Sequence, residues 1–219
     1  VGQMSMQTGQ PPWLPQWMDF LNHVRTFFRG KNLLEVQTPT LVTCPGTEPF
    51  LDLFSTELVM GSRRQKFYLP TSPELSLKKL LAQGYSEIFE IKNCFRNGEI
   101  SERHQPEFYM LEWYRTFCDL SQIQQDISHL FEYLAEVLPN SRYYKKTFQF
   151  HKKSMSQLFA DHLQFELTPT TSIEELKVLA AKLGLHAQDY NLWDDVFYLI
   201  FIEKIEPFLD STEPMFVEK

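Results

Sequence analysis

The spacing of apolar positions predicts three helices in the first part of the chain. Residues 16–29 carry an apolar stripe at helical spacing, which ends at Gly30. The tetrapeptide T-S-P-E begins a second helix, for which Ser72 is the predicted N-cap and Gly84 the predicted stop. Asp119 is predicted to cap a long third helix with apolar positions between 120 and 137.

Apolar runs between these helices predict a hairpin-rich sheet. Two runs, 88–96 and 107–115, flank a ten-residue polar loop and are predicted to pair as a hairpin. Shorter runs predict strands at 33–36, 50–54, 57–60 and 67–69.

Strand alternation places side chains of distinct chemistry on one face of the second long run. Phe108, Met110, Glu112 and Tyr114 share this face, because side chains two residues apart point the same way. The first run ends in Arg96, and the loop ends in Arg103 and His104. These side chains combine an aromatic ring, a carboxylate, a phenol and several cations. Such a set suits the binding of a polyphosphate, a flat heterocycle and a compact cation side by side. This stretch is the candidate site.

The character of the sequence changes from Pro139 onward. Helices are predicted near 154–163, 172–183 and 191–205, the second with a capping box formed by Ser172 and Glu175. The chain is therefore expected to comprise a flexible arm (1–15), a core that holds the site (16–138) and a helical insertion (139–219).

Composition restricts the classes of partner. Hydrophobic residues at 43% and charged residues at 22% are ordinary for a globular protein. A net charge of −7 argues against a broad electrostatic surface for nucleic acid. Small basic clusters at 63–66, 142–146 and 151–153 are interpreted as solvated loop charge, with docking of an acidic partner as the alternative.

The cysteines and the hydropathy pattern bear on the compartment. Cys44, Cys94 and Cys118 form an odd set without C-x-x-C spacing, which favours reduced thiols in the cytoplasm. The sequence has no apolar run of the length that a membrane span requires, so we expect no membrane association.

Several motifs in the order of one family cover about residues 16–120. G-K-N-L-L-E-V-Q-T-P, residues 30–39, resembles motif 1 of class II aminoacyl-tRNA synthetases. F-R-N-G-E, followed by R-H-Q-P-E-F and L-E-W-Y, resembles their motif 2 in its lysine-type form, and T-S-P-E resembles the segment between the two motifs. The resemblance implies an α+β fold: a mainly antiparallel sheet flanked by helices, which dimerises through the motif 1 helix.

Within this family the chain resembles a short subgroup. Only about 15 residues precede the first helix, too few for an anticodon-binding barrel, and L-E-W-Y-R at 111–115 is similar to the same subgroup. These paralogues attach lysine or β-lysine to a lysine of translation elongation factor P, so tRNA is not the expected acceptor. The alternatives are a fragment of a lysyl-tRNA synthetase and a non-catalytic, synthetase-like binding module.

The resemblance also assigns residues to the nucleotide, and ATP is the expected cosubstrate. Arg96 matches the motif 2 arginine, expected to bridge the amino-acid carboxylate and the α-phosphate; alone it would be read as a structural ion pair. Phe108 matches the phenylalanine that stacks on adenine. The resemblance also assigns the loop residues: Arg103 and His104 to the β- and γ-phosphates, and Asn97 and Gln105 to adenine or ribose. The alternative for these four is a solvated turn.

Amino-acid selection is assigned to the helix start and the second strand. The expected residues are Ser72, Pro73, Glu74, Glu112 and Tyr114. Two carboxylates and a phenol favour a diamine and repel an acidic amino acid. Glu74 has a structural alternative as an acid in the first turn of a helix, whereas Glu112 on an otherwise apolar strand face is costly to bury without a cation.

The sequence departs from the family pattern in two places. The usual motif 2 glutamate position holds Gly98, and Glu99 follows it, so we expect the loop to rearrange if Glu99 is to serve ATP. No glycine follows Gly184, although motif 3 is glycine-rich. We therefore expect the motif 3 portion, with the protein ligands of Mg²⁺, to be absent from this sequence, and no metal site within it.

Overall fold

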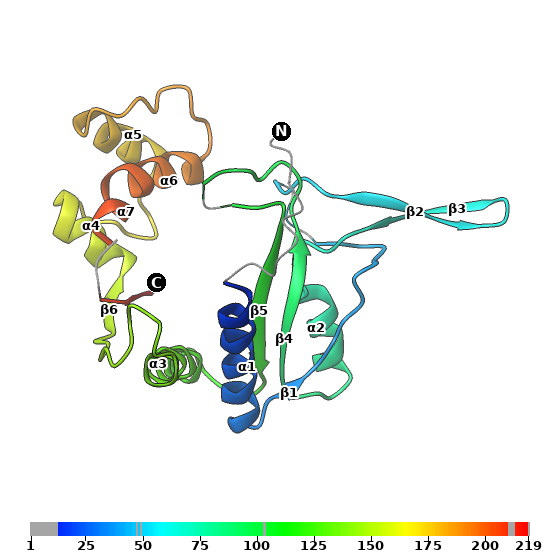
Figure 1. Ribbon diagram of the computed structural model, residues 1–219. Coiled ribbons are helices and arrows are strands. Elements are labelled where there is room, and N and C mark those ends of the chain that lie inside the picture. Colours follow the sequence, from blue (N-terminus) through cyan, green and yellow to red (C-terminus); the bar gives the residue numbers. More distant parts are fainter. Residues whose placement is uncertain (1–12, 47, 49, 103, 210–212, 219) are drawn as a thin grey trace. The chain divides into compact units, whose positions relative to one another are not determined.

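A computed structural model describes residues 13–46, 48, 50–102, 104–209 and 213–218 (Figure 1). The chain divides into two compact units. The first comprises residues up to 123 together with 137–140, and the second comprises 124–136 and the chain from 141 onward. Within the described ranges, no helix is both long and apolar enough to cross a membrane. Cys44, Cys94 and Cys118 are free thiols, as the sequence predicts.

The first unit is built on a three-stranded sheet in the order β1 (Leu34–Glu35), β4 (Glu87–Phe95), β5 (Glu107–Arg115). β4 and β5 form the predicted antiparallel hairpin, whose register runs from Glu87 opposite Arg115 to Phe95 opposite Glu107. β1 pairs with β4 in parallel. The sheet is therefore mixed, and the expected α+β class is confirmed.

Helix α1 (Leu14–Gly30) covers one face of this sheet. The ring of Phe28 on α1 is fully buried. It stacks on Phe89 of β4, with ring centroids 5.1 Å apart, and its centroid lies 5.2 Å from that of Trp113 on β5. Phe89 and Trp113 are cross-strand partners, so they share a face. The apolar stripe predicted at 16–29 is thus the core-facing side of α1.

A buried polar network holds the segment after β1 against the other face of β4. The carboxylate of Glu90 accepts hydrogen bonds from the Thr38 amide (2.8 Å) and hydroxyl (2.7 Å). Lys92 Nζ donates to the Thr38 carbonyl (2.5 Å) and lies 3.3 Å from Glu90 Oε1. Each buried charge therefore has both a counter-ion and hydrogen-bond partners, which offsets the cost of desolvation.

The segment between β1 and α2 (Glu74–Ala82) forms a second hairpin. β2 (Ser55–Met60) and β3 (Arg63–Tyr68) pair antiparallel around the two-residue turn Gly61-Ser62, where Gly61 has φ +62°. The strands predicted at 57–60 and 67–69 lie in or overlap this hairpin. The basic run 63–66 lies on β3, so placing it in a loop was wrong.

The strand predicted at 50–54 does not form. Only Asp52 makes an isolated bridge, opposite Asn97, and the side chain of Phe50 is 93% exposed. The apolar run at this position has no continuous partner strand among the described residues, and without a partner an apolar sequence does not become a strand.

The second unit packs short helices around its own core. The predicted helices are present as α4 (Met155–Leu163), α5 (Ile173–Lys182) and α6 (Trp193–Lys204), followed by α7 (Glu206–Leu209). The predicted capping box of Ser172 and Glu175 is confirmed at α5. Fully buried side chains from these helices form the core: Leu158, Phe159, Leu176, Ala180, Val196 and Ile200.

The second unit also holds a strand pair that the sequence did not predict. β6 (His151–Ser154) pairs in parallel with β7 (Met215–Glu218). Most of α3 (Leu120–Val137), capped by Asp119 as predicted, belongs to the same unit, where Gln124 Nε2 donates to Glu218 (2.6 Å). The part from 139 onward is therefore not purely helical.

Phe28→Ala is expected to lower the free energy of unfolding by about 3–5 kcal/mol, because it removes a buried ring between two strands. Phe50→Ala is the matched control, since the same atoms are removed from an exposed side chain, and it should change stability by less than about 0.5 kcal/mol. Chemical denaturation of both variants measures the difference. Equal losses would contradict the packing of α1 on this sheet.

Candidate active site

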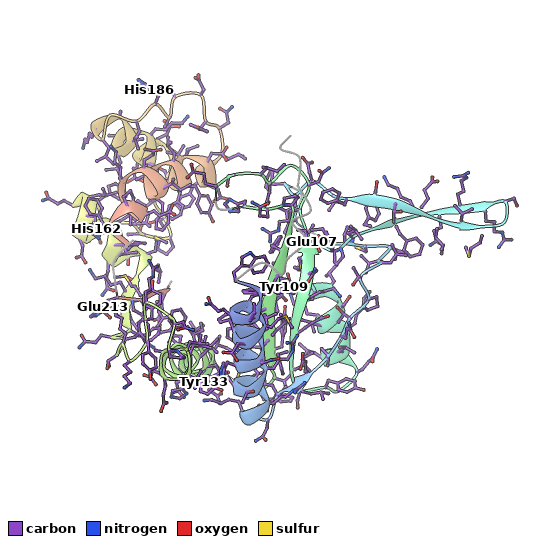
Figure 2. The ribbon with its side chains drawn as sticks, in the orientation of Figure 1. Glu107, Tyr109, Tyr133, His162, His186 and Glu213 are labelled. Carbon is purple, nitrogen blue, oxygen red and sulfur yellow. The ribbon has the colours of Figure 1, made fainter. Side chains whose placement is uncertain are left out.

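The predicted alternation on β5 is confirmed by its pairing with β4. Phe108 lies opposite Cys94, and Glu112 lies opposite Glu90. Phe108, Met110, Glu112 and Tyr114 therefore share the face that α1 does not cover. The other set of β5 side chains points to α1: the ring of Tyr109 lies 5.4 Å from that of Trp17 (Figure 2). The candidate site occupies the face opposite the aromatic core.

Arg96 lies beside Phe108, as the pattern predicts. Its guanidinium carbon is 5.2 Å from the centre of the Phe108 ring, and its Nη1 is 3.7 Å from Glu99 Oε2. Its backbone amide donates to the Pro106 carbonyl (2.9 Å), which closes the neck of the loop. The Nε of Arg96 is buried without a hydrogen-bond partner among the described residues. A buried donor without an acceptor is costly, so it suits an incoming anion.

The first loop residues explain the glycine that departs from the family pattern. Gly98 has φ +79°, in the left-handed region that a side chain disfavours. The preceding amide, of Asn97, donates to the Asp52 carbonyl (2.9 Å), and a Cβ on Gly98 would lie 3.5 Å from Asp52 Oδ2. With glycine at this turn, the carboxylate of the next residue, Glu99, is the one that approaches Arg96.

The end of the loop is closed by a small hydrogen-bonded turn. The hydroxyl of Ser101 lies 2.8 Å from His104 Nδ1 and accepts from the His104 amide (3.1 Å). The His104 imidazole and the Gln105 side chain are both exposed, and they belong to the loop that connects Arg96 to β5. Arg103, also predicted for the site, lies outside the described residues.

A cavity of about 430 Å³ brings together the residues predicted for the amino acid. Glu74, Glu112 and Tyr114 line it, and at the edge strand β5 it is also bordered by Leu111 and Trp113, which belong to the face that α1 covers, and by Ile123. The phenol of Tyr114 donates to Glu112 Oε2 (3.0 Å). The cavity therefore combines two carboxylates, a phenol and an apolar wall, which is the chemistry of a site for an alkyl ammonium group.

Electrostatics favour a cation in this cavity. Burial raises the pKa of Glu112; the hydrogen bond from Tyr114 opposes this, and the carboxylates of Glu74, Glu90 and Glu48 raise the pKa further. Burial, then the nearby Glu112, also raises the pKa of Tyr114 above its ordinary range. A bound ammonium would stabilise the ionised form of Glu112.

Glu74 already holds a cation of the chain. Lys78, one helical turn later, forms an ion pair with its carboxylate, and the hydrogen bond that Lys78 donates to Glu74 is the main cause of the raised pKa of Lys78. The i, i+4 spacing is the sequence signal that the prediction missed. An ammonium ligand would thus compete with Lys78 for Glu74.

The start of α2 differs by one residue from the prediction. Pro73, not Ser72, occupies the N-cap position, and α2 begins at Glu74. The Ser72 hydroxyl accepts only a long hydrogen bond from the Glu74 amide (3.3 Å). The predicted N-cap was therefore one residue too early: Pro73 occupies that position with a helical backbone (φ −79°, ψ −5°) and has no side-chain group that could cap the helix.

Glu48 is a further acid near the cavity that sequence reasoning missed. A Cβ on Gly46 would lie 2.7 Å from both Glu48 Oε2 and Thr71 Oγ1, so the carboxylate folds over the glycine towards the hydroxyl. Its charge contributes to the raised pKa of Glu112. The Pro45-Gly46 turn in front of an acid is the signal that could have identified it.

A metal site is not assembled by the described side chains. No group of three His, Cys, Asp or Glu residues lies together there in a way that could hold an ion.

Comparison with known proteins identifies the family of the chain. The family of class II tRNA synthetases for aspartate, lysine and asparagine (D, K and N) matches residues 14–215, which is most of the chain. The chain therefore belongs to the class II aminoacyl-tRNA synthetase family. The resemblance read from the motifs is confirmed.

Similar proteins carry a more specific name. The chain is 34% identical over 209 residues to an elongation factor P–(R)-β-lysine ligase of Pseudoalteromonas translucida, covering 93% of this chain and 61% of that protein. Ligases of the same name from Buchnera aphidicola and Haemophilus influenzae are each 33% identical, covering 91% and 94% of this chain and 59% and 63% of their own lengths. The chain thus spans about three fifths of the length of these relatives.

Glu112→Gln is expected to raise the melting temperature at neutral pH. The pKa of Glu112 is higher in the folded state than in the unfolded chain. Between these two pKa values the folded protein keeps a proton that the unfolded chain has released, so the free energy of unfolding falls as pH rises through this range. Glutamine removes this cost and can still accept from Tyr114. The gain should disappear as pH falls below the ordinary carboxyl pKa of about 4.3.

Thermal melts of the variant and the parent across pH measure this difference. Glu102→Gln removes the same charge from an exposed loop position and serves as the control. A constant difference between Glu112→Gln and the parent at every pH would refute the electrostatic account of the cavity.

Proposed function

We propose that this protein activates a lysine-type amino acid with ATP and transfers it to a lysine of elongation factor P. The observation that carries the proposal is the shared sheet face, on which Arg96 and Phe108 lie in line with the acidic cavity of Glu112 and Tyr114. The names of the similar ligases support the acceptor and the choice of β-lysine.

The first step forms an aminoacyl-adenylate. A carboxylate oxygen of the amino acid attacks the α-phosphorus of ATP, the new oxygen–phosphorus bond forms, and pyrophosphate leaves. Arg96 holds the carboxylate and the α-phosphate with its planar guanidinium, including the Nε that lacks an acceptor among the described residues. Charge that builds up on the α-phosphate is thereby stabilised in the transition state.

The nucleotide base lies on Phe108 in this proposal. The Arg96 guanidinium carbon lies 5.2 Å from the centre of the Phe108 ring. In the proposed complex the base stacks on the same ring, which therefore contacts both the base and the cation. Asn97, Gly98, Glu99 and Gln105 contact adenine or ribose, and His104 and Arg103 meet the outer phosphates. Magnesium, when bound with ATP, neutralises phosphate charge.

The amino acid is selected through its side-chain ammonium. Glu112, held by Tyr114, and Glu74 provide charge-assisted contacts, and the apolar wall of the cavity contacts the methylene chain. Ser72 and Pro73 shape the entrance at the start of α2. An acidic amino acid would be repelled, which explains the preference for a diamine.

The second step passes the acyl group to a protein. The acceptor lysine attacks the activated carbonyl, an amide bond forms, AMP leaves, and the ammonium proton is lost to solvent. An enzyme of translation with free thiols fits the cytoplasm. Dimerisation through α1 remains part of the proposal, as in the family.

ATP–pyrophosphate exchange by the complete gene product, with magnesium and either α-lysine or β-lysine, tests activation. Exchange with β-lysine and transfer to elongation factor P are the expected results. No exchange with either amino acid would remove the proposal in favour of a binding module, and charging of tRNA would replace it by a lysyl-tRNA synthetase.

Arg96→Ala is expected to lower exchange by about 100-fold or more, because it removes transition-state stabilisation. The melting temperature should stay near that of the parent, since the side chain is 28% exposed. Arg142→Ala, at an exposed turn, is the control. A large loss of stability would show that Arg96 is structural.

Glu112→Gln is expected to raise the KM for the amino acid by about tenfold or more, since one charge-assisted contact is lost. The KM for ATP should not change. Steady-state exchange at varied concentrations separates the two constants, and an equal rise in both would contradict the division of the site into two parts.

A further inference from the structure

The β2–β3 hairpin lacks the packing that usually stabilises such an element. Every residue of β2 is exposed, as are Arg63–Lys66 of β3. Apart from the bridge of Val42 to Tyr68 at its base, the described chain gives the hairpin no third strand. In Figure 1 it extends away from the sheet as an arm. An isolated two-stranded hairpin is at best marginally stable in water, so this arm is suited to packing against a partner.

Both faces of the arm carry apolar side chains. Leu58 and Met60 share one face with Phe67, and Val59 lies on the other with Glu57 and Lys66, as the pairing register dictates. Val59 and Met60 are 55% and 50% exposed. Exposed aliphatic and methionine side chains on a projecting element are typical of a protein interface.

The arm is basic, although the chain is acidic overall at −7. It carries Arg63, Arg64 and Lys66 against the single carboxylate of Glu57. Arg64 pairs with that carboxylate at 2.8 Å. The partner that complements the arm is therefore acidic.

The root of the arm touches the candidate site. The Asp52 carbonyl, just before β2, accepts the Asn97 amide at 2.9 Å, and Asn97 follows Arg96 directly. Just after β3, the Pro70 carbonyl accepts the Phe95 amide at 2.9 Å. A macromolecule bound along the arm would thus have its near end at the loop of the site.

We propose that the β2–β3 hairpin docks an acidic face of the protein acceptor, and so brings the acceptor amine to the activated carbonyl. This inference rests on the proposed function. Three cations among exposed apolar residues are too few for the phosphate contacts of a nucleic acid. Two copies of this basic arm would repel each other, which disfavours an arm-to-arm contact between two copies of the chain.

Arg63→Gln combined with Lys66→Gln is the decisive variant, because it leaves the Arg64–Glu57 pair intact. With the complete gene product, the KM for elongation factor P is expected to rise about three- to tenfold, as two exposed charge contacts are lost. The rise should shrink at high salt. ATP–pyrophosphate exchange, which needs no acceptor, should keep the parent's rate.

Arg142→Gln combined with Lys145→Gln is the matched control, since it removes the same charge from an exposed turn of the second unit. Its KM for the acceptor should stay within about twofold of the parent's. Met60→Ser tests the apolar contribution and should raise the KM for the acceptor without altering its salt dependence. An equal effect of the hairpin and control variants would overturn the proposal.

The other occupants have distinct signatures. Unchanged acceptor KM with loss of tRNA binding in the hairpin variant would assign the arm to RNA. A shift to a smaller species in sedimentation would assign it to a second copy, and either result overturns the proposal. If the parent shows no exchange, the proposed function fails, whereas equilibrium binding of elongation factor P to parent and variant still tests the docking.

Discussion

The antiparallel register of β4 and β5 is the constraint on which the candidate site depends. It sets Phe108 opposite Cys94 and Glu112 opposite Glu90, and it turns Trp113 and Phe89 together to the other face. A slip of one residue would send the acids into the aromatic core beneath α1 and expose the rings. The stacking of Phe28 on Phe89 therefore secures the core and the site at once.

The two acids that face each other across β4 and β5 differ in their hydrogen-bond and ion-pair partners. Glu90 has a lysine and two donors from Thr38, whereas the Glu112 carboxylate opposite it receives the hydroxyl of Tyr114. Two like charges facing each other across a strand pair are destabilising. The ionised Glu112 carboxylate therefore lowers the stability of the fold, and a bound cation would offset this loss. Such a loss of stability is expected at a functional site.

The sequence predicts those parts of the structure that depend on local periodicity. Alternation along 107–115 correctly places Phe108, Met110, Glu112 and Tyr114 together, and the cap of Asp119 and the box of Ser172 with Glu175 are found as expected. The family resemblance supplies what periodicity cannot, namely the roles of Arg96 and Phe108. Those roles stay predictions, because the geometry fixes positions and not chemistry.

Contacts between segments distant in sequence explain what was missed. The parallel pairing of β6 with β7 joins residues more than 60 positions apart, and H-K-K-S shows no alternation of apolar and polar residues. The Glu48 carboxylate lies close to Gly46 and the hydroxyl of Thr71, a contact between segments that the local sequence does not predict. Gly98 looks like a defect in motif 2 until its positive φ and the contact of Asn97 with Asp52 are known.

The hairpin arm is the proposed binding element for the protein acceptor, which the cavity is too small to hold. Under the proposed function, the cavity of about 430 Å³ selects the amino acid, and the protein acceptor has to be recognised outside the cavity. The arm joins the site through the backbone contacts of Asp52 with Asn97 and of Pro70 with Phe95, and Figure 1 shows the arm extending away from β4 and β5. Because distant sites contribute independently, substitutions on the arm can change acceptor affinity without altering activation. Under the proposed function, separate elements of one unit would thus recognise the amino acid and the acceptor.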